Sequence, residues 1–223
     1  MGVGSTLGAV RVTSAHDPTR LAVLVHEVRS PVAALSAIAE AFSDEDLEHR
    51  ARLELSQLAI TACLGIQRVV IDAAVASVRL VPVDAGALVH QVGATANLSG
   101  ACVSVEVAPE LPRITADPVR LRQALDNLVA NALRHSGSGG GVVVEATSTN
   151  ALVLLSVSDS GIGVPLGDQE RIFEAGVRLD ADRPGSGLGL AITRAIAEAH
   201  GGQLTLRSIP GEGATFTIVI PAS

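Results

Sequence analysis

The sequence predicts a two-domain chain, in which a helical hairpin is followed by a two-layer α/β domain. Between residues 21 and 76, apolar residues recur at alternating spacings of three and four, which is typical of helices in a bundle. After residue 81, short alternating segments and glycine-containing turns are interleaved with helical stretches. The 223 residues are enough for one large or two small domains, each with a real core.

Composition and charge exclude several classes of protein. Aromatic residues make up 1% of the chain, so Ala, Val, Leu and Ile must fill the core. The net charge of −7 provides no basic surface, which disfavours a nucleic-acid partner. Cys63 and Cys102 are isolated thiols, for which a reducing, cytoplasmic setting is a simpler explanation than a disulfide. The longest uncharged run, 85–105, is too polar to cross a bilayer, and no signal peptide precedes it, so we expect no membrane segment.

Residues 1–17 are predicted to be a lead-in, and residues 18–80 a helical hairpin. The apolar ladder of the first helix consists of Leu21, Val25, Val28, Val32, Leu35, Ala39 and Phe42. His26 comes one position after a ladder residue and should therefore point toward solvent. Pro31 removes one backbone hydrogen bond and should kink the helix one turn after His26.

The second helix is predicted over about residues 46–79, after a turn at 43–46 whose serine and acidic residues suit a helix start. Its stripe is mostly Ala and Gly, with Leu58 among the larger members, and it permits close helix approach. A hairpin of two helices buries too little apolar surface by itself. We therefore expect a homodimer in which two hairpins form a four-helix bundle.

Residues 81–223 are predicted to form the second domain, with residues 80–83 as the linker. Asp84 and Asp117 are suited to cap helices, the second with proline directly after it. Helices are predicted over about 85–97, 118–135 and 187–200, and strands near 102–107, 142–148, 151–158, 203–208 and 214–220. Helices and mainly antiparallel strands in this order favour a two-layer α/β sandwich.

Two asparagines carry the first chemical signal of this domain. Asn127 and Asn131 lie four apart, so they share one face of a helix that ends with Arg134 and His135. Neutral amide oxygens suit a Mg²⁺ ion that already carries phosphate oxygens and water. Taken alone, the pair is better explained by a solvated helix face or a helix cap.

Two glycine-containing segments follow. Asp159 ends a predicted strand, its carboxylate can accept a hydrogen bond from an exocyclic amine, and Gly161 and Gly163 allow close backbone approach. Gly185-Ser-Gly-Leu-Gly precedes a helix, whose free N–H groups and dipole attract phosphate. The alternatives are a plain turn and a flexible hinge, and the second segment fits the dinucleotide-binding glycine pattern poorly.

In this order, the histidine, the paired asparagines, Asp159, Phe173 and the glycine-rich segment resemble the sensor histidine kinases of two-component systems. The resemblance covers about residues 18–221. It implies a dimerisation and phosphotransfer domain, followed by an ATP-binding domain of the Bergerat type shared with Hsp90, MutL and gyrase. The implied activity is ATP-dependent autophosphorylation of a histidine and transfer of the phosphoryl group to an aspartate of a response regulator receiver domain.

The resemblance also assigns residues. His26 matches the phosphoacceptor, and Glu27 matches the acid that orients or deprotonates it. Ser30 stands where the family usually has Thr or Asn, a residue linked to dephosphorylation of the partner. The implied ATP-binding residues are Asn127, Asn131 as the Mg²⁺ ligand, Arg134, Asp159, Gly161, Gly163, Gly185, Gly187 and Gly189.

Two departures qualify the resemblance. Gly176 stands where the family often has a second aromatic residue, so we expect a looser loop over the nucleotide. No sensor region or membrane anchor precedes His26, so we expect either a catalytic core or a chain that receives its input from a separate sensor protein. Two other functions are alternatives: a phosphotransfer scaffold with a degenerate nucleotide site, and an ATPase switch like Hsp90 or MutL.

Overall fold

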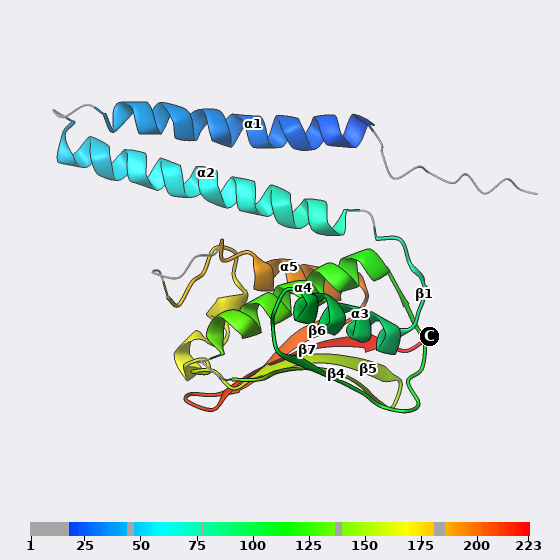
Figure 1. The fold of residues 1–223 in the computed structure, drawn as a ribbon. Helices are drawn as coiled ribbons and strands as arrows, with labels where there is room; N and C mark the ends of the chain where they lie inside the picture. Colours follow the sequence, from blue (N-terminus) through cyan, green and yellow to red (C-terminus); the bar gives the residue numbers. More distant parts are fainter. Residues whose placement is uncertain (1–17, 44–46, 77, 137–139, 181–185) are drawn as a thin grey trace, which may run out of the picture. The chain divides into compact units, whose positions relative to one another are not determined.

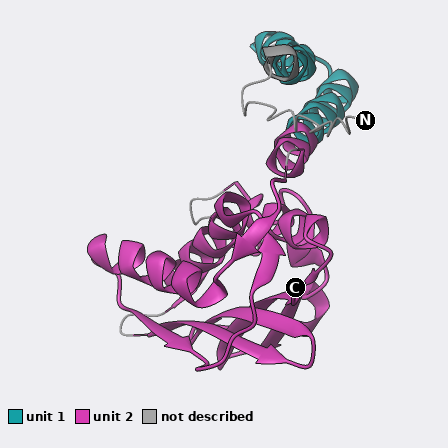
Figure 2. Cartoon of the chain, turned by 90° about the vertical axis from the view of Figure 1, so that its right-hand side faces the viewer, with its two compact units in different colours: residues 1–66 teal, residues 67–223 magenta. Residues whose placement is uncertain are grey.

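The computed structural model describes residues 18–43, 47–76, 78–136, 140–180 and 186–223. The predicted lead-in, 1–17, therefore lies outside the described residues, as does most of the predicted turn at 43–46. The chain forms two compact units, residues 1–66 and 67–223 (Figure 2). Their boundary lies inside the second helix, so the end of that helix belongs to the second unit.

The first unit is a helical hairpin, as the sequence predicts. Helix α1 (Pro18–Ala41) and helix α2 (His49–Val75) lie side by side (Figure 1). Helix α1 continues through Pro31. Helix α2 ends at Val75, earlier than the predicted end at residue 79.

Contact between the two helices covers only one side of each. Ile38 and Ala62 are buried. Val25 and Val32 of the predicted ladder and Leu58 of the predicted stripe, which together form the predicted seam, are 46–56% exposed. One hairpin cannot cover these residues, because each helix has a single neighbour within the unit. They form an apolar surface that a second copy of the chain could cover.

Helix α2 also has a property that the sequence analysis did not anticipate. Within the part of the chain that the structure describes, α2 is the one helix long and apolar enough to cross a membrane by length and composition alone. An amphipathic bundle helix rich in Ala, Leu and Ile meets the same criterion, so this finding is weak evidence for a membrane segment.

The second unit begins with a short strand where the sequence analysis predicted a linker. Strand β1 (Val81–Val83) pairs antiparallel with β3 (Ile114–Ala116). The prediction of an unpaired linker over 80–83 was wrong at these three residues. Strands this short carry little periodicity, and only the partner strand, far along the chain, defines them.

A five-stranded sheet forms one layer of the second unit. Its strand order is β2-β4-β5-β7-β6, with β2 parallel to β4 and all other pairs antiparallel. The strands are β2 (Val103–Val107), β4 (Val142–Thr149), β5 (Leu152–Asp159), β6 (Gln203–Ile209) and β7 (Gly213–Pro221). Each of these five strands begins and ends within one residue of its predicted bounds.

Three helices cover one face of the sheet and form the second layer (Figure 1). They are α3 (Ala85–Leu98), α4 (Pro118–His135) and α5 (Gly189–Ala199). The fully buried residues between the layers include Leu121, Leu125, Leu128, Val144, Leu155, Ile196 and Ile218. The predicted two-layer α/β domain is confirmed, and its core is aliphatic, as the composition requires.

The predicted helix caps are confirmed at both positions. The Asp84 carboxylate accepts from the Ala87 N–H at the start of α3. The Asp117 carboxylate accepts from two N–H groups in the first turn of α4, and Pro118 follows it. These caps fix where α3 and α4 begin. The start of α4 in turn determines which residues lie in its C-terminal turns.

Candidate functional site

A cavity of about 450 Å³ lies within the second unit. It is lined by the C-terminal half of α4, the loop between β5 and α5, the start of α5 and two residues of β7. Its volume is in the range of pockets that hold small molecules, about 300–1,000 Å³. It is the candidate ligand site of this unit.

Helix α4 contributes polar residues from one face. Asn127, Asn131 and Arg134 all line the cavity, because spacings of four and three return to the same side of a helix. The opposite side of α4 is apolar and buried, which fixes this orientation. The Asn127 side-chain N–H donates to the Gly189 carbonyl oxygen at 3.3 Å, so α4 is joined to the start of α5 beside the cavity.

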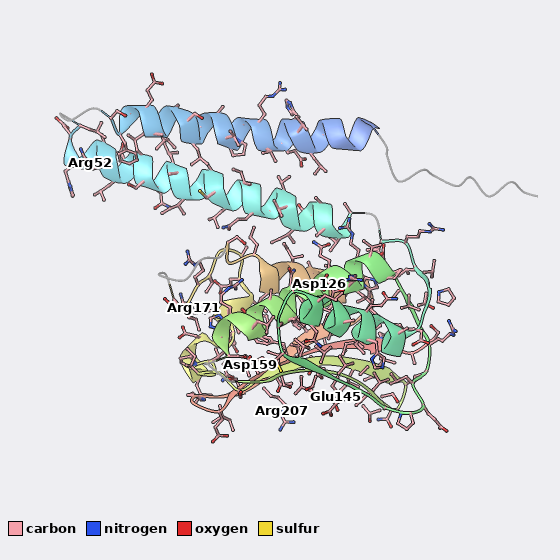
Figure 3. The ribbon with its side chains drawn as sticks, viewed as in Figure 1. Arg52, Asp126, Glu145, Asp159, Arg171 and Arg207 are labelled. Carbon is pink, nitrogen blue, oxygen red and sulfur yellow. The ribbon has the colours of Figure 1, made fainter. Side chains whose placement is uncertain are left out.

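Asp159 lies at the end of β5, buried and facing the cavity (Figure 3). Its Oδ1 accepts from the backbone N–H of Gly161 at 2.9 Å, which closes a tight turn after the strand. The second carboxylate oxygen can accept a hydrogen bond from a ligand in the cavity.

The glycines after Asp159 are required by close packing. A Cβ on Gly161 would lie 2.3 Å from the His135 carbonyl oxygen. Gly163 has a positive φ of 68°, and a Cβ there would lie 2.4 Å from the Ile209 carbonyl oxygen. No larger residue fits at either position, so both glycines hold Asp159 and the loop in place.

The loop between the cavity and α5 is closed at its base by two glycines. The Gly176 N–H donates to the Gly187 carbonyl oxygen at 3.0 Å, and both residues have positive φ. Their backbones are so close that a Cβ on Gly187 would lie 2.7 Å from the Gly176 carbonyl carbon. The positive φ of residue 176 explains why glycine stands there. We expected a looser loop over the nucleotide, but the base of this loop is held by the hydrogen bond to Gly187. Gly185 lies outside the described residues.

The start of α5 presents backbone N–H groups near the cavity. Gly187, Gly189 and Leu190 line it, and the N-cap position is held by Leu188, whose side chain cannot accept a hydrogen bond. The first-turn N–H groups of a helix have no partner within the helix, and the helix dipole makes this end positive. Such an end is suited to bind phosphate.

The donors around the cavity fit a nucleotide phosphate better than a metal centre built by the protein alone. Arg134 and Arg178 line the cavity together with Asp159, Asp168 and Asp180. Across the described residues, no group of three or more His, Cys, Asp or Glu side chains could hold a metal ion. The amide oxygen of Asn131 suits a hard cation that receives its other ligands from phosphate and water.

The predicted phosphoacceptor residues lie in the first unit. His26, Glu27 and Ser30 are all exposed on α1. Helical spacing places Ser30 one turn after His26, so the two share a face. The structure thus places these three residues on one helix. Of the described residues predicted to bind ATP, all but Gly161 line the cavity, and Gly161 lies in the turn that Asp159 closes.

Sequence reasoning missed Thr193 and Phe216. Thr193 is fully buried, and its hydroxyl lies 2.8 Å from the Gly189 carbonyl oxygen and 3.4 Å from that of Ala124. Phe216 lines the cavity and packs edge-on against Phe173, with ring centroids 6.3 Å apart. A threonine among the apolar residues at the start of the predicted helix was a usable sequence signal, whereas the position of Phe216 depends on the register of the sheet.

Comparison with known proteins agrees with this geometry. The family model described as "Histidine kinase-, DNA gyrase B-, and HSP90-like ATPase" matches residues 116–223. The curated "Sensor-like histidine kinase SenX3" of Mycobacterium tuberculosis is 32% identical over 212 residues, which are 88% of this chain and 52% of that protein. The chain spans about half or less of the length of these curated relatives.

Solved structures extend the similarity to the fold. The structure of full-length ShkA in complex with AMPPNP is similar with a TM-score of 0.64 at 32% identity, over 92% of this chain and 46% of that one. The ATP-binding domain of PrrB from Mycobacterium tuberculosis has a TM-score of 0.52 at 32% identity, over 65% of this chain and 98% of that domain. The chain therefore belongs to the sensor histidine kinases of two-component signalling, with an ATP-binding domain of the GHKL type.

Proposed function

We propose that this chain is an ATP-dependent protein histidine kinase that phosphorylates His26 and passes the phosphoryl group to an aspartate of a response regulator. One observation carries the proposal: a single cavity combines Asn131, Asp159 and the open start of α5, in a chain that also exposes a histidine beside an acid on α1. Transfer of a phosphoryl group from a nucleotide in the cavity to His26 accounts for both features together.

The cavity has a side suited to adenine and a side suited to phosphates. On the adenine side, the Asp159 carboxylate accepts from the exocyclic amine, and Gly161 and Gly163 shape the loop that holds Asp159 in place. On the phosphate side, the N–H groups at the start of α5 and the Arg134 guanidinium bind phosphate oxygens. Asn127 supports the nucleotide one turn before Asn131, and Gly185, Gly187 and Gly189 allow the backbone to approach the phosphates.

Asn131 is the proposed protein ligand of Mg²⁺. When bound, the ion would supply positive charge that neutralises the phosphate oxygens during transfer. A carboxylate at this position would repel the triphosphate, whereas a neutral amide does not. The donor set described above fits this role.

In the transfer itself, the lone pair of one His26 ring nitrogen attacks the γ-phosphorus. The bond between this phosphorus and the β–γ bridging oxygen breaks, and ADP leaves. The proton on the other ring nitrogen passes to Glu27, which also orients the ring before attack. The protein accelerates the step mainly by positioning the reactants and neutralising charge.

The receiver domain of a response regulator is the proposed second substrate. The bond between the His26 nitrogen and phosphorus breaks as an aspartate oxygen bonds to the phosphorus. The proton returns from Glu27 to the other ring nitrogen, which leaves a neutral imidazole. Ser30, one turn along the same face, is proposed to support hydrolysis of the resulting aspartyl phosphate.

The proposed assembly is a homodimer in which the exposed seam residues of two hairpins meet in a four-helix bundle. The catalytic part is proposed to work in the cytoplasm, where response regulators and ATP are found. A separate sensor protein is one proposed source of its input.

The deciding experiment is labelling with γ-labelled ATP and Mg²⁺. Wild-type protein should gain acid-labile label, and His26→Gln should gain none, because glutamine has no nucleophilic ring nitrogen. His49→Gln, a second exposed histidine in the same unit, is the matched control and should label normally.

Two results would contradict the proposal. Equal labelling of wild type and His26→Gln would remove His26 as the acceptor. Steady phosphate release that does not depend on His26 would favour an ATPase switch instead. Mixing His26→Gln with Asn131→Ala subunits then tests whether a subunit phosphorylates itself or its mate, since label in the mixture requires transfer between subunits.

A further inference from the structure

His200 is a buried polar residue that the proposed transfer does not use. It follows α5 directly and is 7% exposed. Its Nδ1 lies 2.7 Å from the Ile196 carbonyl oxygen, and its Nε2 lies 2.9 Å from the backbone nitrogen of Asp117. A carbonyl oxygen only accepts and a backbone N–H only donates, so the ring carries its proton on Nδ1 and accepts at Nε2. His200 therefore joins the end of α5 to the residue that begins α4.

Asp117 is itself held from several directions. Its Oδ1 accepts from the N–H groups of Val119 and Arg120 at 2.9 and 3.1 Å, and its Oδ2 accepts from the Arg79 N–H at 2.8 Å. The Asp117 side chain is thus held by α4 and by the segment after α2, while the Asp117 backbone N–H donates to His200 Nε2. We refer to the contact between these two residues as the Asp117–His200 clamp.

The clamp lies at the end of the α4–α5 pair that is distant from the cavity. The two helices are antiparallel, because Asp117 meets His200 while Asn127 meets Gly189. Between these two contacts, the buried residues of the two helices are apolar except Thr193, whose hydroxyl lies 3.4 Å from the Ala124 carbonyl oxygen. The fully buried apolar residues of this stretch include Leu121, Ala124, Leu128, Ile196 and Ala197.

Apolar packing is not directional, so by itself it defines the position of one helix along another only weakly. Hydrogen bonds have narrow limits of length and angle, and they define that position sharply. We infer that His200 is a positioning residue for the phosphate side of the site, because the clamp fixes how far α5 lies along α4. It thereby sets Gly187 and Gly189 relative to Asn131. This inference rests on the proposed function, which assigns the phosphates to these residues.

Titrations of the full chain with ATP and Mg²⁺, and separately with adenosine, test the inference. The ratio of the adenosine Kd to the ATP Kd measures what the phosphates contribute to binding. In His200→Leu, this ratio should fall about tenfold, the loss expected for one buried hydrogen bond. Adenosine affinity should stay at its wild-type value, because Asp159 lies at the end of strand β5 and not on α4 or α5. His90→Leu, at an exposed histidine of α3, is the matched control.

His200→Gln provides the rescue, because its amide N–H can donate to Ile196 and its amide oxygen can accept from Asp117. It should restore most of the phosphate contribution. A wild-type ratio in His200→Leu would overturn the inference, and so would equal weakening of ATP and adenosine, which a merely structural role would cause. Absence of ATP binding by the wild type would instead contradict the proposed function.

A measurement on the wild type completes the test if His200→Leu does not fold. Coupling between two sites is reciprocal, so phosphate binding must stabilise the clamp as much as the clamp favours phosphate. Exchange of the Asp117 amide hydrogen should slow when ATP and Mg²⁺ bind, and should not slow when adenosine binds. Equal protection by both ligands, or by neither, would overturn the inference.

Discussion

At the residue scale, Asp159 combines a structural and a proposed binding role in one carboxylate. Oδ1 closes the turn after β5 through the Gly161 N–H, and the second oxygen remains for a ligand. The side chain is buried at the edge of the cavity (Figure 3). Because the two oxygens have separate tasks, a substitution that changes only one of them can separate folding from binding.

We expect Asp159→Asn to weaken ATP binding by about 1–3 kcal/mol while the protein stays folded. Asparagine keeps an oxygen for Gly161, but its NH₂ group would face the donating amine of adenine. Isothermal titration measures the loss. Asp126→Asn, on the exposed side of α4 (Figure 3), is the control and should bind ATP normally. Normal ATP affinity in Asp159→Asn would contradict the assigned role.

A second prediction at this scale concerns Gly161. A methyl group there would lie 2.3 Å from the His135 carbonyl oxygen and 2.7 Å from Asp159 Oδ1. The backbone of α4 cannot move aside cheaply, so Gly161→Ala should destabilise the protein by about 1–3 kcal/mol and reduce ATP binding. Gly167→Ala is the control, since its Cβ would meet nothing within 4 Å. Thermal unfolding distinguishes them, and equal melting temperatures would contradict the expectation.

At the element scale, α4 connects the two ends of the second unit. Its first turn is capped by Asp117, and its last two turns carry Asn131 and Arg134 at the cavity. Arg120 extends the connection, because its Nη2 donates to the Ala73 carbonyl oxygen near the end of α2. Three features of one helix thus lie on a path from α2 to the proposed phosphate site.

The cap also predicts a dependence of stability on pH. Burial acts to raise the pKa of Asp117, but hydrogen bonds from the Arg79, Arg120 and Val119 N–H groups and the Arg120 charge together lower it below its ordinary value of 3.8. A carboxyl group whose pKa is lower in the folded state stabilises the protein above its unfolded pKa. That contribution is lost as the pH falls through the folded pKa.

We therefore expect Asp117→Ala to lower the free energy of unfolding by about 1–2 kcal/mol at neutral pH. The difference from wild type should be constant down to about pH 5 and should shrink below the ordinary pKa of 3.8. Urea unfolding at several pH values measures it. Asp84→Ala, which removes a cap that accepts from one N–H group of α3, should cost less. A difference that persists unchanged in acid would contradict this account.

At the scale of the whole molecule, the two units differ in what they can bury. The second unit has an aliphatic core between a sheet and three helices, whereas the hairpin leaves apolar seam residues exposed. The proposed four-helix bundle also explains why α2 is long and apolar, because a bundle helix needs an apolar seam along its whole length. The proposed dimer is therefore the event that completes the first unit.

We expect the double substitution Val32→Gln and Leu58→Gln to shift the dimer toward monomer and to lower labelling of His26, because polar amides would enter the seam. Leu53→Gln, at a 60% exposed residue outside the predicted seam, is the matched control. Light scattering after size-exclusion chromatography gives the mass, and ATP titration should be unchanged in both proteins. A monomeric wild type, or an intact dimer in the double variant, would contradict the proposed assembly.

The sequence by itself determined the elements whose signals are local. The ladder from Leu21 to Phe42, the caps at Asp84 and Asp117 and the alternating strands of the sheet all follow from residues close together in the chain. The polar face of α4 was predictable for the same reason, because helical periodicity alone brings Asn127, Asn131 and Arg134 to one side.

Only the tertiary structure decided the features that depend on distant partners. Strand β1 forms because β3 pairs with it. Glycine is required at position 187 because the backbone of Gly176 lies against it. The sequence presented His200 as a residue at a helix end, and only the packing of α5 on α4 joined it to Asp117. The physical reason is that hydrogen bonds and close contacts between distant segments depend on the relative placement of packed elements, which local periodicity does not specify.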